Sequence, residues 1–200
     1  PSGDKLIMVR LVDWQFHLSY YDFSNNKIID LTSDDTFTPL NDYMIEWSKD
    51  ETNVIFTILR GFSTYVILFN TENKSNSRIT NDIVESKESG ELIFCKSGSW
   101  IDNYKFIYMC SKSELDYSNI YEYDMHTNSS NILKTVYEDS LEFIIQDLKI
   151  NKDGDKIIFL GKNRKLRFNN FFEMNLKTEE IKQITFSESE KGWLRLYEEL

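Results

Sequence analysis

Short apolar runs separated by polar clusters recur along the whole chain. Residues 157–160 are apolar at every position, which is typical of a strand covered on both faces, and this pattern places Ile158 in the interior. The run after it alternates, with Phe172, Met174 and Leu176 on one side and polar residues on the other. The two patterns predict β-strands joined by turns.

The same pattern occurs four times at a spacing of about fifty residues, which indicates stacked copies of one structural unit. Each copy opens with a polar turn before its apolar run, at 2–5, 50–53, 102–105 and 153–156. A second anchor follows each run, at Asp22, Asn70, Asp124 and Asn175. A third anchor is the pair at 31–32, 79–80, 133–134 and 184–185. Because three anchors keep the same register, the copies are internal repeats.

Each copy is expected to form four strands. The predicted strands of the third copy are 91–96, 104–110, 118–124 and 130–134. Those of the fourth are 143–150, 155–161, 168–175 and 181–185. The turn chemistry agrees, because Asp153-Gly154 can adopt positive φ angles, and the side chains of Asp124 and Asn175 can cap the following amides.

These expectations define the fold class as all-β, a β-propeller of four-stranded antiparallel blades with about four blades present. The chain is expected to be a single propeller segment over 1–200, with blades at about 1–35, 42–82, 91–136 and 142–187. Residues 192–200 are expected to form the first strand of a next blade, in a parent propeller of six to eight blades. The alternative is closure of a four-bladed ring, in which 193–198 completes the first blade.

The repeat anchors resemble those of a known group. Trp47-Ser48-Lys49-Asp50 followed by Val54-Ile55-Phe56 is similar to the opening half of TolB-like propeller repeats. The stretch 119–127 is similar to the closing half, and Ile184-Thr185 to its last pair. In the third and fourth copies, Ser99 and Ile150 stand at the place of Trp47. The group is related to WD-repeat propellers and to the propeller domains of prolyl-oligopeptidase and dipeptidyl-peptidase enzymes. It includes transport accessories, peptidase gating domains and sugar-acid lyases, so the resemblance implies the fold rather than one function.

Composition narrows the classes of partner. The chain of 200 residues is 40% hydrophobic, which supports a folded core, and its net charge of −10 argues against nucleic acid and anionic membrane surfaces as partners. No apolar run is long enough to span a membrane, so we expect no membrane insertion. The compartment and the oligomeric state stay open; an extracytoplasmic location follows only if the TolB-like resemblance extends to function.

Two cysteines lie on the predicted first and second strands of the third blade. A hairpin near 97–103 places Cys95 and Cys110 nearly opposite each other. Because a cross-strand disulfide requires specific geometry, two free buried thiols are the favoured expectation. The bonded pair is the alternative.

The sequence holds no recognisable catalytic or metal site. Ser97-Gly98-Ser99-Trp100 lacks the flanking glycines of a nucleophile elbow and is expected in a hairpin turn. His17 and His126 have no third zinc ligand in reach, and Asp153-Gly154-Asp155 is explained by a turn better than by calcium. We therefore expect no catalytic residue, metal or cofactor, and no enzymatic activity for this segment.

The remaining feature is a contrast of charge. A basic cluster at Lys162, Arg164, Lys165 and Arg167 falls in the predicted loop between the second and third strands of the fourth blade. The acidic links between blades, with Asp34, Asp35, Glu138, Asp139, Glu188 and Glu190, are expected on the same face. Aromatic residues occupy the corresponding loops of the other blades, at Trp14, Phe62 and Tyr117.

These loops predict a non-catalytic scaffold that binds a protein or peptide on one face. The simpler interpretation of the same residues is a solvated basic loop and aromatic side chains folded back onto the blades. Two alternative functions are the gating propeller of a larger serine peptidase and a metal-dependent propeller of the sugar-acid lyase type.

Overall fold

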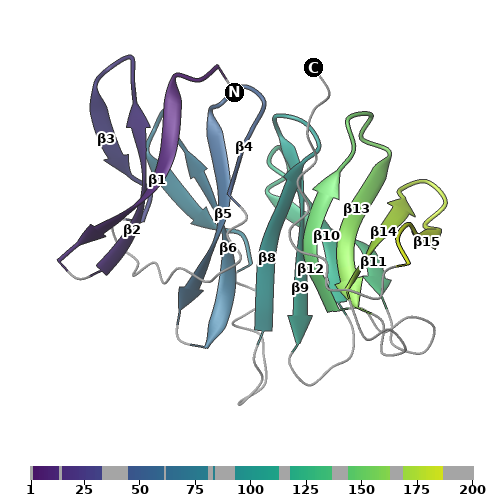
Figure 1. Cartoon of the computed structure of the whole chain (residues 1–200). Coiled ribbons are helices and arrows are strands. Elements are labelled where there is room, and N and C mark those ends of the chain that lie inside the picture. Colours follow the sequence, from purple (N-terminus) through teal and green to yellow (C-terminus); the bar gives the residue numbers. More distant parts are fainter. Residues whose placement is uncertain are drawn as a thin grey trace.

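The computed structural model describes residues 2–13, 15–32, 45–60, 62–80, 83, 93–112, 118–136, 144–162 and 169–186 (Figure 1). The described residues form fifteen strands in four groups. The first group contains β1 (Lys5–Val12), β2 (Gln15–Asp22) and β3 (Lys27–Asp30). The second contains β4 (Glu46–Trp47), β5 (Asn53–Arg60), β6 (Ser63–Asn70) and β7 (Ser75–Arg78). The third contains β8 (Ile93–Trp100), β9 (Lys105–Lys112), β10 (Ser118–Asp124) and β11 (Ser129–Val136). The fourth contains β12 (Ile144–Ile150), β13 (Lys156–Lys162), β14 (Asn170–Asn175) and β15 (Ile181–Gln183).

Within each group, consecutive strands pair antiparallel, which is the arrangement of a propeller blade. The second, third and fourth blades have the predicted four strands. The first has three, in the order β1-β2-β3, and β1 corresponds to the second strand of the other blades. A parallel bridge between Thr64 and Phe94 joins the second and third blades into one extended sheet. Among the described residues, no helix is long and apolar enough to cross a membrane.

The core lies in three apolar layers between successive blades. Leu18 and Tyr20 of the first blade pack against Val54 and Phe56 of the second. The second layer is rich in aromatic residues of the third blade, and the third layer joins the third and fourth blades. Because one face of a blade meets the preceding blade and the other face meets the next, the inner blades are apolar on both sides.

Ile158 departs from the expected interior position. Its neighbours Ile157 and Phe159 are fully buried in the third layer, whereas Ile158 is only half-buried. Side chains alternate along a strand, so Ile158 points to the opposite face of the fourth blade. Leu160, on the same face, is buried, so the cover of this face does not extend to Ile158.

The hairpins between the third and fourth strands share one turn geometry. Asp22, Asn70 and Asn175 each accept hydrogen bonds from two following amides, and Asp124 accepts one from the His126 amide at 2.8 Å. In each of these turns, the residue four positions after the capping side chain has a positive φ. These residues are Asn26, Lys74, Asn128 and Glu179. The predicted caps are confirmed, and Gly154 has the predicted positive φ, at 72°. These turns lie at one end of the blades, called here the turn end.

The threonine of the third anchor has a specific role. The Oγ1 atoms of Thr32, Thr80 and Thr185 accept hydrogen bonds from amides of the third strand in their own blades, at 3.0, 3.1 and 3.0 Å. Each threonine satisfies an amide at the point where the short outer strand ends. In the third blade Lys134 stands at this position, and the longer strand β11 continues its ladder there, opposite Ile120. The departure seen in the sequence therefore marks a longer outer strand.

Candidate functional site

The innermost strands β4, β8 and β12 bring three blades into contact. Strand β8 contacts both β4 and β12, and Figure 1 shows these strands side by side near the middle of the molecule. Each innermost strand pairs with the second strand of its own blade. Their inward side chains therefore come from distant parts of the sequence.

A bulge in β8 changes which residue corresponds to Trp47. Trp47 lies opposite Val54, and Trp100 lies opposite Phe106, which is the same position in the next blade. The register of β8 shifts between Ser97 and Trp100, so this strand contains one extra residue. The assignment of Ser99 to the place of Trp47 is therefore wrong; Trp100 occupies it. The stretch 97–100 also lies in the strand rather than in a turn, because the turn begins at residue 101.

One polar cluster links the three innermost strands. The Ser99 hydroxyl donates a hydrogen bond to Glu46 Oε1 at 2.8 Å, and the Trp100 amide donates to the same atom at 3.3 Å. Lys149 forms an ion pair with Glu46 Oε2. The Trp100 indole N–H donates to the Glu46 carbonyl at 3.1 Å. We call Glu46, Ser99 and Lys149 the inner-strand cluster.

The cluster follows the repeat. Glu46, Ser99 and Lys149 each immediately precede the residue at the anchor position, which is Trp47, Trp100 or Ile150. The side chains of Glu46 and Lys149 are 26% and 25% exposed, so the ion pair is partly shielded from water but remains in contact with solvent. Its charges compensate each other, and its bonds join three blades. Sequence reasoning missed Glu46 and Lys149. Their common position before the anchor is the signal that could have found them.

Gly98 allows the close approach of the third and fourth blades. A Cβ atom at this position would lie 2.6 Å from the Ile107 carbonyl oxygen and 2.8 Å from Leu148 Cδ2. Only glycine fits between these atoms. The bulge and the glycine together let β12 lie against β8, which places Lys149 within reach of Glu46.

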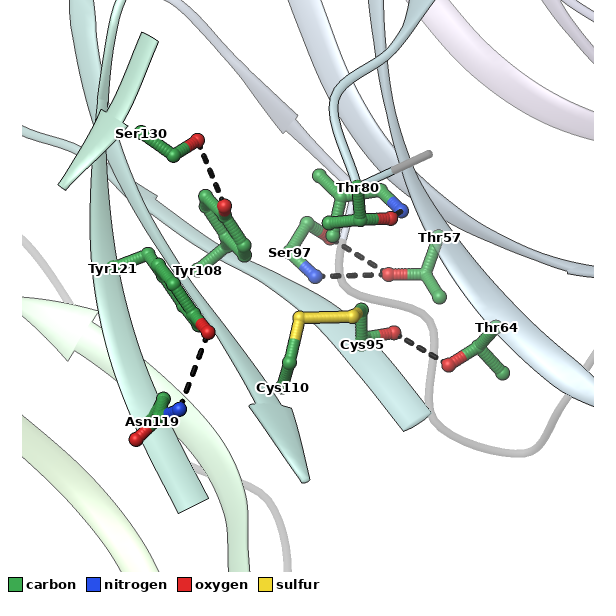
Figure 2. Close-up of a disulfide and its surroundings, with 11 residues drawn as sticks. Thr57, Thr64, Thr80, Cys95, Ser97, Tyr108, Cys110, Asn119, Tyr121 and Ser130 are labelled. Atoms are coloured by element: carbon green, nitrogen blue, oxygen red, sulfur yellow. Dashed lines mark hydrogen bonds between the residues drawn. A yellow bond between two sulfur atoms is a disulfide. The ribbon is translucent and has the colours of Figure 1, made fainter. Parts of the chain in front are cut away.

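The two cysteines form a disulfide, so the expectation of free thiols is wrong (Figure 2). Cys95 and Cys110 lie directly opposite each other on β8 and β9, with Cα atoms 4.0 Å apart. This approach brings the two side chains together on one face of the sheet. Both residues are buried in the layer between the second and third blades.

Polar contacts surround the disulfide and join β8 to the second blade. The Ser97 amide donates to Thr57 Oγ1 at 2.9 Å, and the Thr64 hydroxyl donates to the Cys95 carbonyl at 2.6 Å. Tyr108 stacks on Tyr121 with ring centroids 4.9 Å apart. Burial raises the pKa of Tyr108, so this phenol stays protonated across the physiological range. These contacts support a rigid packing role for the layer.

The histidines occupy the predicted positions. His17 lies on β2, which corresponds to the third strand of the other blades. His126 lies in the β10–β11 turn, where the centroid of its ring is 4.4 Å from that of Tyr104. Within the part of the chain that the structure describes, no three His, Cys, Asp or Glu side chains group as metal ligands.

The structure describes little of the predicted binding loops. Trp14, Arg164, Lys165, Arg167 and Tyr117 lie outside the described residues, as do the six acidic residues of the links between blades. Lys162 is the last residue of β13, with its backbone opposite Ile144. Phe62 lies in the β5–β6 turn and is 80% exposed. Because only Phe62 has a described side chain, the structure brings none of the seven residues together.

Comparison with known proteins identifies the fold. No family model matches the sequence, and no curated protein sequence matches it. Among solved structures, TolB from Acinetobacter baumannii is similar with a TM-score of 0.63 and 17% identity, over 92% of this chain and 41% of that one. An oligogalacturonate lyase in complex with manganese is similar with a TM-score of 0.60 and 15% identity, over 90% of this chain and 50% of the other.

A third similar structure is dipeptidyl peptidase 4 from Porphyromonas gingivalis, with a TM-score of 0.57 and 12% identity, over 90% of this chain and 30% of that one. The chain thus spans half or less of the length of these relatives. Identities this low establish the architecture and leave the activity open. Together with the four repeated blades, the likeness shows that this chain has the fold of a TolB-like β-propeller.

Proposed function

We propose that this chain is a non-catalytic propeller scaffold that binds a protein or peptide at the end of the blades opposite the turn end. We call it the loop end; it contains the connections after β1, β5, β9 and β13, at 13–14, 61–62, 113–117 and 163–169. The strand ends that lead into these connections point the same way in Figure 1. The proposal treats 1–200 as one propeller segment.

The observation that carries the proposal is the exposure of Phe62. An aromatic side chain that is 80% exposed at a hairpin tip gains nothing for the fold, and exposed aromatic residues are common anchors of interfaces. The two ends of the blades also differ in the regularity of their connections. The turn end repeats one tight geometry four times, whereas the loop-end connections differ in length from blade to blade. Variable loops on a constant scaffold are typical of binding surfaces.

The basic residues near the loop end indicate the chemistry of the expected partner. Lys162, Arg164, Lys165 and Arg167 concentrate positive charge near the loop end of a chain whose net charge is −10. A partner segment that is acidic and contains an aromatic or aliphatic anchor would match both this charge and Phe62. The inner-strand cluster contributes indirectly, because it holds together the blades that carry the loops.

The test uses peptides that are selected from a displayed library of random peptides for their binding to the whole chain. Replacing Lys162, Arg164, Lys165 and Arg167 by Ser is expected to weaken binding of the selected acidic peptides about tenfold and to reduce its salt dependence. Phe62→Ser is expected to weaken binding as well. The matched control replaces four turn-end lysines by Ser: Lys49, Lys74, Lys152 and Lys177. Equal losses in the two quadruple variants, or none in either, would reject the loop end as the binding face.

A further inference from the structure

The disulfide lies close to the loop end of the third blade. Cys110 is two residues before Lys112, where β9 ends and the loop-end connection 113–117 begins. Cys95 is two residues after Ile93, the first residue of β8, and Ile93 lies opposite Lys112. The bond therefore clamps β8 to β9 at the point where both strands reach the loop end.

The same part of β8 holds the hairpin of Phe62. The Thr64 hydroxyl donates a hydrogen bond to the Cys95 carbonyl at 2.6 Å, beside the disulfide (Figure 2). Thr64 also forms the parallel bridge with Phe94, which is the one strand pairing between the second and third blades in the described part of the chain. Phe62 comes two residues before Thr64, at the exposed hairpin tip. A short series of contacts thus joins the disulfide to the proposed interface anchor.

Other contacts hold β8 farther from the loop end. The Ser97 amide donates to Thr57 Oγ1 at 2.9 Å. The inner-strand cluster joins the other end of β8 to the second and fourth blades. Neither contact includes a cysteine. A change at the disulfide is therefore expected to act on the loop-end part of β8 and on the Phe62 hairpin, while the blades stay together.

A polar group beside the disulfide favours its reduced state. Asn119 lies directly opposite Cys110 on β10, so the two side chains are neighbours on one face of the blade. The Asn119 Oδ1 atom is buried without a hydrogen-bond partner, and an unpaired buried acceptor is unfavourable. A disulfide has no hydrogen to donate, whereas a thiol has an S–H group. Reduction of Cys110 thus places a donor next to this acceptor.

We propose that the Cys95–Cys110 pair is a redox switch for the Phe62 hairpin. In the disulfide state, β8 is clamped to β9, and the hydrogen bond of Thr64 holds the hairpin against the third blade. In the dithiol state, the loop-end part of β8 separates from β9, and the hairpin loses its fixed position. The effect on partner binding rests on the proposed function of the loop end, because it requires that Phe62 contacts the partner.

The reductant in this switch is a dithiol. One of its thiolates attacks a sulfur of the pair; the S–S bond breaks, a mixed disulfide forms, and the other cysteine leaves as a thiolate. The second thiol of the reductant then attacks the mixed disulfide and releases the remaining cysteine. Two electrons and two protons pass to the pair, and the reductant becomes a disulfide. Because both cysteines are buried, the attack requires the strands to open at the loop end, and a bound partner hinders it.

The test compares the whole chain, labelled with 15N, before and after reduction with dithiothreitol. Amide hydrogen exchange is expected to accelerate about tenfold at Thr64 and to stay unchanged at Val66, whose amide bonds to Thr80. Selected loop-end peptides without cysteine are expected to bind about tenfold more weakly after reduction, and reoxidation should restore their binding. By linkage, saturating peptide then lowers the reduction potential of the pair by about 30 mV.

Two matched variants separate the switch from a general loss of stability. Thr64→Val removes the hydroxyl that bonds to Cys95, and it is expected to bind peptide weakly in both redox states. Thr80→Val removes another buried hydroxyl in the same blade and is expected to keep the full redox effect. The double variant Cys95→Ala, Cys110→Ala is expected to bind like the reduced chain and to be insensitive to dithiothreitol.

The outcomes distinguish the switch from the proposed function. Equal exchange at Thr64 in the two redox states would overturn the switch. Faster exchange at Val66 as well would also overturn it, since reduction would then unfold the blades in general. Peptide binding that depends on Phe62 but not on the redox state would reject the switch and leave the loop-end proposal intact. If no selected peptide depends on Phe62, the proposed function fails, and exchange at Thr64 alone decides the switch.

Discussion

The Ser99 hydroxyl donates a hydrogen bond to Glu46 Oε1 at 2.8 Å, across the boundary between the second and third blades. The two residues occupy the same place in successive repeats, immediately before the anchor residues Trp47 and Trp100. Lys149 has this place in the fourth blade and completes the contact. Repetition of one structural unit has thus placed three different polar side chains at one point, where they bond to one another.

The buried threonine of the third anchor predicts a loss of stability on removal of its hydroxyl. Thr80→Val keeps the shape of the side chain but leaves the Val66 amide without its acceptor, in a region where both residues are fully buried. We expect the free energy of unfolding to fall by about 1–3 kcal/mol. Urea denaturation measures this change. Thr127→Val, in an exposed turn, is the control and is expected to change it by less than about 0.5 kcal/mol.

The turns with positive φ predict a stabilising substitution. Lys74 has φ = 59° at the position where Asn26 and Asn128 stand in two other blades. This conformation is sterically unfavourable for lysine and not for glycine. Lys74→Gly is therefore expected to raise the free energy of unfolding by about 0.5–1 kcal/mol. Lys27→Gly, in the regular strand β3, is expected to lower it. A Lys74→Gly protein that melts below the unmodified chain would show that the turn is not in this conformation.

Stability is expected to fall in acid through the turn carboxylates. Hydrogen bonds from Asn25, together with the Ser24 amide, hold the pKa of Asp22 below its usual value. A lowered pKa in the folded state means that the unfolded chain binds the proton more readily, so the stabilising contribution is complete above the ordinary pKa and is lost as the pH falls through the lowered one. Asp22→Asn keeps the acceptor oxygen, as Asn70 and Asn175 do, and removes the charge. The variant is expected to lose less stability than the unmodified chain below about pH 4; equal losses in both proteins would exclude Asp22 as a contributor.

The disulfide predicts a sensitivity to reduction. Cys95 and Cys110 close a loop with a sequence separation of 15, and a link of this length typically contributes about 3 kcal/mol by restricting the unfolded chain. The double variant Cys95→Ala, Cys110→Ala is expected to unfold at correspondingly lower urea concentration. Added reductant should then have no further effect on that variant. A reductant effect of equal size in the variant and the unmodified chain would contradict the bond.

Much of the fold follows from the sequence because the repeat fixes the register of short-range features. Strand β10 spans the predicted 118–124, and the caps at Asp124 and Asn175 form as expected. Local turn chemistry decides these features, so one copy of the repeat predicts the others. The third-blade departure at Lys134 was visible too, although only the structure shows that it accompanies a longer outer strand.

Three features could not be predicted, because two depend on the exact register of paired strands and the third on packing between blades. The bulge in β8 adds one residue, and spacing alone cannot distinguish a bulge from a longer turn. The spacing therefore places Ser99 at the position equivalent to Trp47, which Trp100 occupies in the structure. The disulfide required the register of two strands to be known to within one residue. The half-buried Ile158 depends on which faces of a blade are covered, which an apolar run does not reveal.

The coupling energy between Glu46 and Lys149 is the measurement that tests most directly whether equivalent residues of different blades meet on the inner strands. A double-mutant cycle with Glu46→Gln and Lys149→Met, followed by urea denaturation, isolates this energy. The pair is about one-quarter exposed and its partners come from the second and fourth blades, so we predict a favourable coupling of about 1 kcal/mol that decreases with added salt. Additive effects of the two substitutions, with no coupling at low salt, would contradict the arrangement of the blades described here.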